Sequence, residues 1–513
     1  MSLPRRWVLL LALPALACGG EAARVSQPPP PAERPSVVLI SVDTLRADRL
    51  GCYGGERPTS PRLDALATEG VVYDEALAPT PWTLPSHAAL LTGIHPWTLG
   101  VVNQWRSLPS EAETLAQRLA ATGYHTAAFV DSLPRGFVGA ERGFDRGFEV
   151  FEHAPHDDRD PDRRYDVAAT VDAGVGWLEE RGDDPRPFFL FLHTRSVHAV
   201  PTDEPCRDPH CAPYDQPEPF RERFSDERGA PWRSPDDEAV GQAYLWWLNE
   251  GLTQGSLDRD VLPTERLEEL VALYDAGIFY TDHHLGRLFD ALDAAGLSDS
   301  TWVVVTSDHG ESFLEHDLLM HQEVYRETLR VPLIVRPPHR EAISPQRVPT
   351  PVALEDVAVS ILDWAGAPTG LAGAAGDLAA EDRAGGGELP LALEGRTLPG
   401  FGPAAEASED REFFAYYLFP EKFDYRAFAL RREGHVLVTH NFESLAGETE
   451  GSPGRQLLAW GDEHRSVDDP QRLDAMVRSL RRRVAEPPKA IAEHGRHREQ
   501  ALGVDLETLG YID

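Results

Sequence analysis

The chain has 513 residues, with 84 acidic and 49 basic side chains and a formal net charge of -35 at pH 7. A negative charge of this size repels nucleic-acid backbones and anionic lipid surfaces, so it argues against a nucleic-acid partner. The apolar share of 42% and the mean hydropathy of -0.36 exclude a polytopic membrane protein. The length suits one large α/β enzyme domain with a smaller satellite.

The first 18 residues are typical of an export signal. Arg5 and Arg6 precede a short apolar stretch at 7–13, and the sequence Ala-Leu-Ala leads into Cys18. This pattern predicts a bacterial lipobox, in which Cys18 becomes the acylated N-terminus. Cleavage after an Ala-x-Ala site without acylation is the alternative.

The Pro-rich segment at 19–35 predicts an extended tether behind the signal. The mature protein is therefore expected outside the cytoplasm, in the periplasm, with a lipid anchor as its only attachment to a membrane. In such an oxidising compartment Cys206 and Cys211 could close a short disulfide. A zinc site there is the weaker interpretation, because His210 is the one further ligand nearby.

Four apolar runs predict buried parallel strands, at 37–42, 126–130, 188–192 and 302–306. Helical patterns separate them, including a long one at 264–295 that Gly296 closes. A Ser110 and Glu113 capping box predicts a helix through residue 119. Alternating strands and helices indicate an α/β fold, with a large parallel-rich mixed sheet sandwiched by helices.

The remaining chain predicts a second unit. The catalytic domain is expected at 36–368, a Gly/Ala-rich flexible excursion at 369–400 and a C-terminal α+β subdomain at 401–513. This subdomain is predicted from short strands at 413–417, 428–431 and 436–439 and from a helix at 469–483.

Polar residues stand at the ends of the predicted strands. Asp43 ends the first, His193 follows the third, and Asp308 and His309 follow the fourth. In parallel sheets the carboxyl ends of strands carry the chemistry, so these groups are expected to converge. Two carboxylates and an imidazole predict a site for one divalent cation, Mn, Ca, Mg or Zn.

Thr83 stands before Pro85 at the start of a predicted helix. Its hydroxyl is expected to act as the N-cap, facing the positive end of the helix. Backbone N–H groups at such an end also favour a bound tetrahedral oxyanion. An ordinary threonine cap explains this segment equally well when it is taken alone.

Four blocks in one order make the pattern more specific. The chain resembles the sulfatase family of the alkaline-phosphatase superfamily in the following segments: VVLISVDTLRADRLGCYG at 37–54, TLPSHAALLTGIHP at 83–96, FFLFLHTRSVHAVP at 188–201 and TSDHGESFLEHDLLMHQEVYRETLRVPLIVRPP at 306–338. The resemblance covers residues 35–368 and, more loosely, the C-terminal subdomain.

The resemblance implies roles for individual residues. Asp43, Asp308 and His309 would hold the metal together with Thr83, which would also be the nucleophile. His198 matches the family histidine that holds an ester oxygen or protonates the leaving group. Two further residues take family positions. His321 stands where a Lys or His is usual, and His87 stands where an Arg is usual and is expected to contact the oxyanion in its place.

The chain departs from true sulfatases at three of these positions. Thr83 replaces the Cys or Ser that becomes formylglycine, Thr44 replaces a second metal-binding Asp, and His87 replaces Arg. Threonine at the nucleophile position resembles the phosphodiesterases and phosphoglycerol transferases of the superfamily. There a Thr hydroxyl beside a divalent cation attacks phosphorus.

These observations predict an exported hydrolase that cleaves a small-molecule, glycan or lipid ester of sulfate or phosphate. Phosphate esters and diesters are preferred on mechanism, because a phosphorylated threonine is hydrolysed by the same in-line step that forms it. One alternative is a transferase of phospho head groups in the cell envelope. Another is a catalytically silent binding lipoprotein, suggested by the missing Arg and second Asp.

Overall fold

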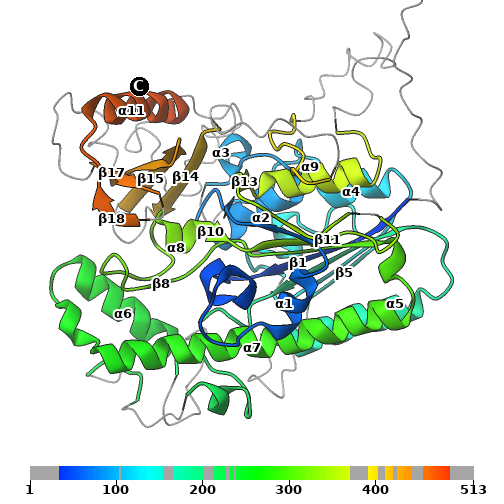
Figure 1. The fold of residues 1–513 in the computed structure, drawn as a ribbon, viewed down its shortest axis with the longest axis horizontal. Coiled ribbons are helices and arrows are strands. Elements are labelled where there is room, and N and C mark those ends of the chain that lie inside the picture. The colour runs from blue at the N-terminus through cyan, green and yellow to red at the C-terminus, as the bar shows by residue number, and fades with distance from the viewer. Residues whose placement is uncertain are drawn as a thin grey trace, which may run out of the picture.

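The central element of the fold is a sheet in which eight described strands lie in the order β12-β2-β11-β7-β1-β6-β4-β5 (Figure 1). Their bounds are β1 Ser36–Val42, β2 Val71–Tyr73, β4 His125–Val130, β5 Val150–His153, β6 Phe188–Thr194, β7 Thr301–Thr306, β11 Leu333–Arg336 and β12 Gln346–Val348. The computed structural model describes residues 34–102, 106–132, 134–153, 166–199, 212–225, 231–235, 239–341, 343–369, 391–401, 411–419, 425–440, 455–460 and 462–485.

The sheet is mostly parallel. β1 pairs in parallel with β6 and β7, and β4 pairs in parallel with β5 and β6, whereas β11 is antiparallel to β7 and β2. All seven residues of β1 are buried, as a strand covered on both faces requires. The predicted parallel-rich mixed sheet is confirmed.

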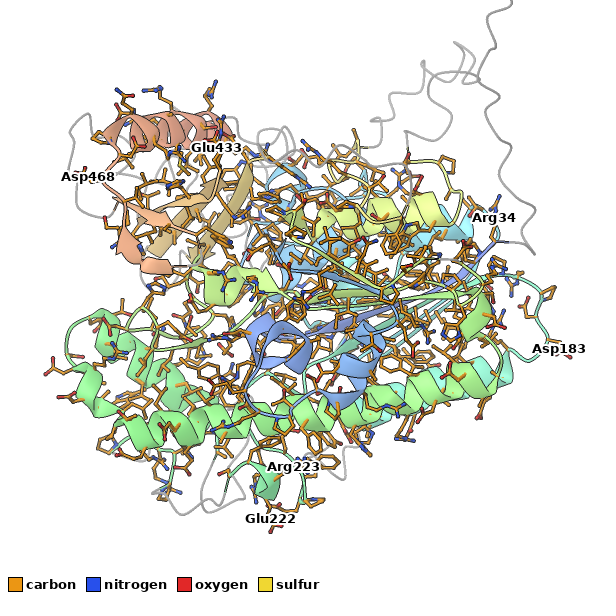
Figure 2. All side chains as sticks on the ribbon, in the orientation of Figure 1. Arg34, Asp183, Glu222, Arg223, Glu433 and Asp468 are labelled. Carbon is orange, nitrogen blue, oxygen red and sulfur yellow. The ribbon has the colours of Figure 1, made fainter. Side chains whose placement is uncertain are left out.

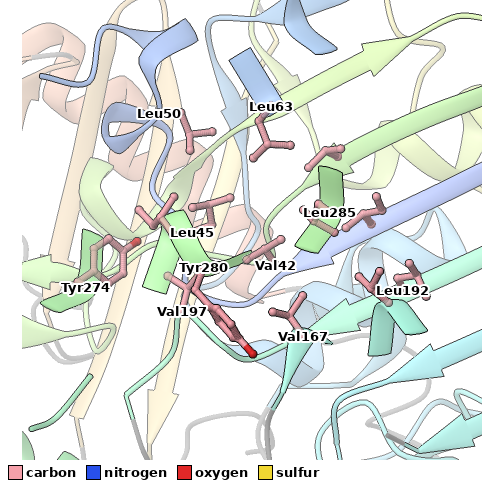
Figure 3. Close-up of a cluster of buried hydrophobic side chains, with 14 of the residues drawn as sticks. Val42, Leu45, Leu50, Leu63, Val167, Leu192, Val197, Tyr274, Tyr280 and Leu285 are labelled. Carbon is pink, nitrogen blue, oxygen red and sulfur yellow. The ribbon is translucent and has the colours of Figure 1, made fainter. Parts of the chain in front are cut away.

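Successive residues of β1 point to opposite faces of the sheet and enter two separate cores. Val38, Ile40 and Val42 pack in one core, shown in part in Figure 3, and Val37 and Leu39 pack in the other. The first core is covered by α1 (Pro61–Ala67), α5 (Val167–Glu180), α6 (Gln242–Thr253) and α7 (Thr264–Ala294). The second is covered by α2 (Thr83–Thr92), α3 (Pro96–Leu99), α4 (Leu115–Ala120) and α9 (Glu355–Trp364).

Short elements connect these layers. The small strands β3 (Ala76–Leu77), β10 (Arg330–Val331) and β13 (Val352–Ala353) form one sheet, and β8 (Ser312–Phe313) pairs with β9 (Leu319–Met320). Helix α8 spans Arg326–Leu329. None of the described helices combines the length and the apolar content that crossing a bilayer requires.

The C-terminal subdomain is an antiparallel sheet with one helix. Its strands lie in the order β14 (Phe413–Phe419), β15 (Tyr425–Arg432), β16 (His435–His440), β17 (Arg455–Ala459) and β18 (Asp462–Ser466), and α11 (Pro470–Ala485) covers one face. The other face packs on Val324, Tyr325 and Leu329 of the α/β domain. The predicted α+β subdomain is confirmed, although β17 and β18 had not been expected.

Two sequence predictions differ from the structure. The helix after residue 110 begins later, because Thr114 caps α4 and forms the capping box with Gln117 in place of Ser110 and Glu113. The end of the expected flexible excursion is docked, since Leu398 is buried and the Arg396 N–H donates to Asp356 at 2.7 Å. The long helix α7 is confirmed, with Gly296 at a positive φ of 66° just beyond it.

Asp183, Glu222 and Glu433 are exposed and lie at the periphery, as Figure 2 shows. The export signal, the tether up to residue 33 and the proposed disulfide between Cys206 and Cys211 lie outside the described residues.

Gly310 tests how tightly the loop after β7 is packed. A Cβ on Gly310 would lie 2.0 Å from the backbone oxygen of Glu327, so we expect Gly310→Ala to lower the free energy of unfolding by about 1–3 kcal/mol. Gly176 in α5 has nothing within 4 Å of such a Cβ, and Gly176→Ala should raise stability by about 0.5–1 kcal/mol. Denaturant unfolding checks both values, and equal effects of the two variants would contradict this account.

Candidate active site

Three neighbouring parallel strands, β7, β1 and β6, end at the same edge of the sheet. Asp43 directly follows β1, Asp308 and His309 lie in the loop after β7, and His193 lies near the end of β6. All four side chains are fully buried. The structure therefore brings together residues that are up to 266 positions apart in the sequence.

Asp43, Asp308 and His309 form a compact ligand set. The His309 Nε2 atom lies 3.6 Å from Asp43 Oδ1 and 3.5 Å from Asp308 Oδ2. Ligand atoms of the three side chains all lie within 4.8 Å of one another. Both carboxylate oxygens of Asp43 and the Oδ2 atom of Asp308 lack a hydrogen-bond partner among the described residues. Buried carboxylate oxygens without donors are costly, so this donor set fits a divalent cation.

Hydrogen bonds orient two of the three ligands, His309 and Asp308. The His309 Nδ1–H donates to the Gly310 carbonyl at 3.0 Å, which leaves the lone pair of Nε2 directed at the carboxylates. Asp308 Oδ1 accepts from the backbone N–H of His309 at 3.0 Å and of Thr44 at 3.3 Å. Its Oδ2 atom is thereby left for the ligand set.

The electrostatics of the metal-free site point the same way. Burial, followed by repulsion from Asp308, raises the pKa of Asp43 to about 7. Burial also raises the pKa of Asp308 to about 7 and lowers the pKa of His309 to about 4. The imidazole is therefore neutral at pH 7, the form that ligates metals.

Thr83 lies beside this set. It is the first residue of α2, is 6% exposed, and its Oγ1 atom lies 3.4 Å from His309 Nε2. Trp82, not Thr83, occupies the N-cap position, and no side chain caps this helix end. The prediction that Thr83 caps the helix is therefore wrong, and its hydroxyl faces the ligand set instead.

His87 supports Thr83 from one helical turn away. Its Nδ1–H donates to the Thr83 carbonyl at 2.8 Å, and its Nε2 accepts from Ser41 Oγ at 2.9 Å. Both ring nitrogens are thus engaged within the protein. This geometry favours a supporting role over the oxyanion contact that the sequence suggests for this position.

His193 packs edge-on against His87, with ring centroids 4.7 Å apart. Neither of its nitrogens has a hydrogen-bond partner among the described residues, and burial lowers its pKa well below the ordinary value. His193, His87 and Asp308 form a second set of possible metal ligands. Because both nitrogens of His87 are already bonded, the set with Asp43 and His309 fits a cation better.

His198 and His321 form the other side of the site. Their ring centroids are 5.2 Å apart, and the His321 ring lies 4.5 Å from the His309 ring. The His198 Nδ1–H donates to the Ala199 carbonyl at 2.8 Å, and His321 Nδ1 pairs with Glu311 Oε1 at 3.1 Å. In both rings Nε2 is therefore the atom that remains for a substrate.

Sequence reasoning missed Tyr274 and Arg195, which build the site, and named Thr44 only as the residue in place of a second metal-binding Asp. Thr44 has a positive φ of 61°, a strained conformation for a β-branched residue. Tyr274 of α7 holds it there, because its hydroxyl donates to the Thr44 carbonyl at 2.6 Å. Arg195, just beyond β6, places its Nε 3.4 Å from Asp43 Oδ2. The strand-end argument that found Asp43 could also have found Arg195, whereas nothing near Tyr274 in the sequence signals its contact.

Comparison with known proteins identifies the family. Residues 35–367 match the sulfatase family. The chain belongs to the sulfatase family. It is 27% identical to an ulvan-active sulfatase of Formosa agariphila, over 90% of this chain and 88% of that protein. It is also 25% identical to the multifunctional alkaline phosphatase superfamily protein PehA of Trinickia caryophylli, over 77% of this chain and 81% of that protein.

Solved structures share the fold of this sulfatase-family chain. The phosphonate monoester hydrolase of Agrobacterium radiobacter superposes with a TM-score of 0.62 at 19% identity, over 88% of this chain and 95% of that one. The family match and these relatives identify an enzyme that hydrolyses ester bonds.

Cation binding to this sulfatase-family protein should depend on pH. Asp43 and Asp308 retain protons up to pH about 7 when no cation is bound, so binding must displace protons and should weaken about tenfold per proton and pH unit below that. The protonated pair stabilises the metal-free fold fully below the unfolded pKa of about 3.9, and this contribution is lost as the pH rises through about 7. We therefore expect Mn²⁺ to raise the unfolding temperature much more at pH 8 than at pH 5.5.

Thermal unfolding of chelator-treated protein with and without Mn²⁺ measures this difference. The double variant Asp43→Asn with Asp308→Asn is the control and should show no Mn²⁺ effect at either pH. An equal Mn²⁺ effect at both pH values, or one that survives in the double variant, would contradict the assignment of the ligand set.

Proposed function

We propose that this protein is an exported, metal-dependent hydrolase that uses Thr83 as its nucleophile to cleave a phosphate or sulfate ester, with phosphate esters and diesters preferred. The observation that carries the proposal is the position of Thr83 Oγ1, 3.4 Å from His309 Nε2 and beside two buried carboxylates. Export and lipid attachment at Cys18 are part of the proposal and rest on the sequence of residues 1–18.

The ligand set supports a role for one divalent cation, held by Asp43, Asp308, His309 and Thr83. Such an ion supplies positive charge that lowers the pKa of a hydroxyl and offsets the charge of the transferred group. Carboxylate oxygens with a single imidazole suit Mn²⁺ and Zn²⁺ as well as Mg²⁺ and Ca²⁺. The protein itself contributes orientation, because the Gly310 carbonyl fixes His309 and the Thr44 N–H fixes Asp308.

In the first step, a bond forms between Thr83 Oγ and phosphorus while the bond to the ester oxygen breaks. The proton lost by the Thr83 hydroxyl balances the proton gained by the leaving alcohol. Nε2 of His198 is suited to carry this proton, since its Nδ1–H is held by Ala199. Nε2 of His321 is oriented in the same way through Glu311.

In the second step, a water oxygen bonds to phosphorus and the bond to Thr83 breaks, which restores the hydroxyl. The same in-line geometry serves both steps. Threonine cannot form the aldehyde that true sulfatases use to release sulfate, and this chemistry favours phosphate. Three buried oxygens of Asp43 and Asp308 lack a hydrogen-bond donor among the described residues. This argues against a silent binding protein, because burying them would otherwise only destabilise the fold.

Replacement of Thr83 tests the proposal. Thr83→Ala should lower kcat by at least about 10³-fold, because the covalent step is lost, whereas Thr83→Ser should retain turnover. Steady-state rates on a nitrophenyl phosphodiester, phosphate monoester and sulfate with added Mn²⁺ measure this. Intact-mass analysis after rapid quench should show a phosphate adduct on wild-type protein and none on Thr83→Ala. Undiminished turnover by Thr83→Ala would remove Thr83 as the nucleophile.

A further inference from the structure

The loop after β6 holds Arg195 in a fixed position. Its backbone N–H donates at 3.0 Å to Oδ2 of Asp131, which is buried at the end of β4. The Ser196 carbonyl accepts from Gln216 Nε2 at 2.5 Å, and the Arg195 carbonyl accepts from the His198 N–H at 2.9 Å. These hydrogen bonds of the surrounding backbone fix the position of the Arg195 Cα atom, from which its side chain extends.

The side chain of Arg195 reaches the ligand set from the solvent side. Its Nε lies 3.4 Å from Asp43 Oδ2, and its Nη2 lies 3.4 Å from His198 Nδ1. The side chain is 18% exposed, whereas His193 and His198 on either side of it are buried. The guanidinium therefore lies between the cation ligands, a proposed proton carrier and solvent.

The site lacks a positively charged side chain at position 87, where the family has an Arg. His87 replaces that Arg, and its two nitrogens are bonded to Thr83 and Ser41. Because Nδ1–H donates and Nε2 accepts, the His87 ring is bonded as a neutral imidazole. A tetrahedral oxyanion held beside Thr83 would obtain neither charge nor a hydrogen bond from His87 as it stands.

We propose that Arg195 binds the oxyanion of the substrate and supplies the charge and donors that position 87 does not. A guanidinium presents five N–H donors in a planar fork, which matches two oxygens of a phosphate or sulfate group. The Nε contact with Asp43 fixes the orientation of that fork. This inference rests on the proposed function, because it assumes a tetrahedral ester at Thr83.

A purely structural role makes a different prediction. If Arg195 only offset the charge of Asp43, its loss would change cation affinity and leave oxyanion affinity unaffected at saturating cation. The two roles therefore separate when cation binding and oxyanion binding are measured independently.

The test compares Arg195→Ala and Arg195→Lys with a matched control, Arg57→Ala. Arg57 also pairs with a fully buried carboxylate, Asp275, which retains Arg49 as a second partner. Calorimetric titration of the Mn²⁺-loaded proteins with orthovanadate should show at least tenfold weaker binding for Arg195→Ala, an intermediate loss for Arg195→Lys and a change within twofold for Arg57→Ala. Mn²⁺ affinity should change less than threefold in all of them.

Turnover supplies a second readout. We expect kcat/KM of Arg195→Ala to fall by about 10²-fold to 10³-fold, as when one oxyanion donor is removed. Added guanidinium ion should restore part of it, and Arg57→Ala should not respond. Unchanged vanadate binding by Arg195→Ala, or weaker binding explained by lost Mn²⁺, would overturn the inference. Failure of the proposed function would appear separately, as undiminished turnover by Thr83→Ala, and the vanadate titration would still decide the role of Arg195.

Discussion

Asp43 and Asp308 set the main constraint on this structure, because three of their four buried carboxylate oxygens lack a hydrogen-bond donor among the described residues. Asp43 and Asp308 face each other across His309 at the carboxyl ends of adjacent parallel strands. Charge in such a place is costly unless it is matched by opposite charge. Contacts around the site nevertheless keep the two carboxylates in place. Thr44 has a left-handed backbone conformation, and the Tyr274 hydroxyl donates to its carbonyl. Gly310 packs closely against the backbone of Glu327. A bound cation explains this arrangement best, because it would offset the buried negative charge of Asp43 and Asp308.

Two positions at which the sequence is expected to depart from the sulfatase pattern lie close together in the structure. Thr83 and His87 lie one turn apart on α2, and the His87 side chain bonds to the Thr83 carbonyl. The imidazole therefore supports Thr83, the proposed nucleophile, from within the protein. The positive charge near Asp43 comes instead from Arg195 on the loop after β6. We infer that the nucleophile, its support and the oxyanion donor differ together from the sulfatase pattern.

Patterns that act over a few residues predicted most of the fold. Continuous apolar runs located β1, β4, β6 and β7, and their polar ends located the ligand set, because parallel strands carry their ends to one edge. Contacts between segments that are far apart in the sequence could not be predicted from it. Tyr274 looks like any core residue of α7. Thr114, which caps α4 in place of the predicted Ser110, also donates to the carbonyl of Arg146, a contact between distant segments.

Anomalous diffraction from crystals grown with Mn²⁺, recorded at the manganese edge, tests the central claim most directly. The account predicts one strong peak within bonding distance of Asp43, Asp308 and His309, with the Thr83 hydroxyl beside it. A protein that hydrolyses an ester while its manganese peak lies elsewhere, or while this site shows no peak, would contradict the account.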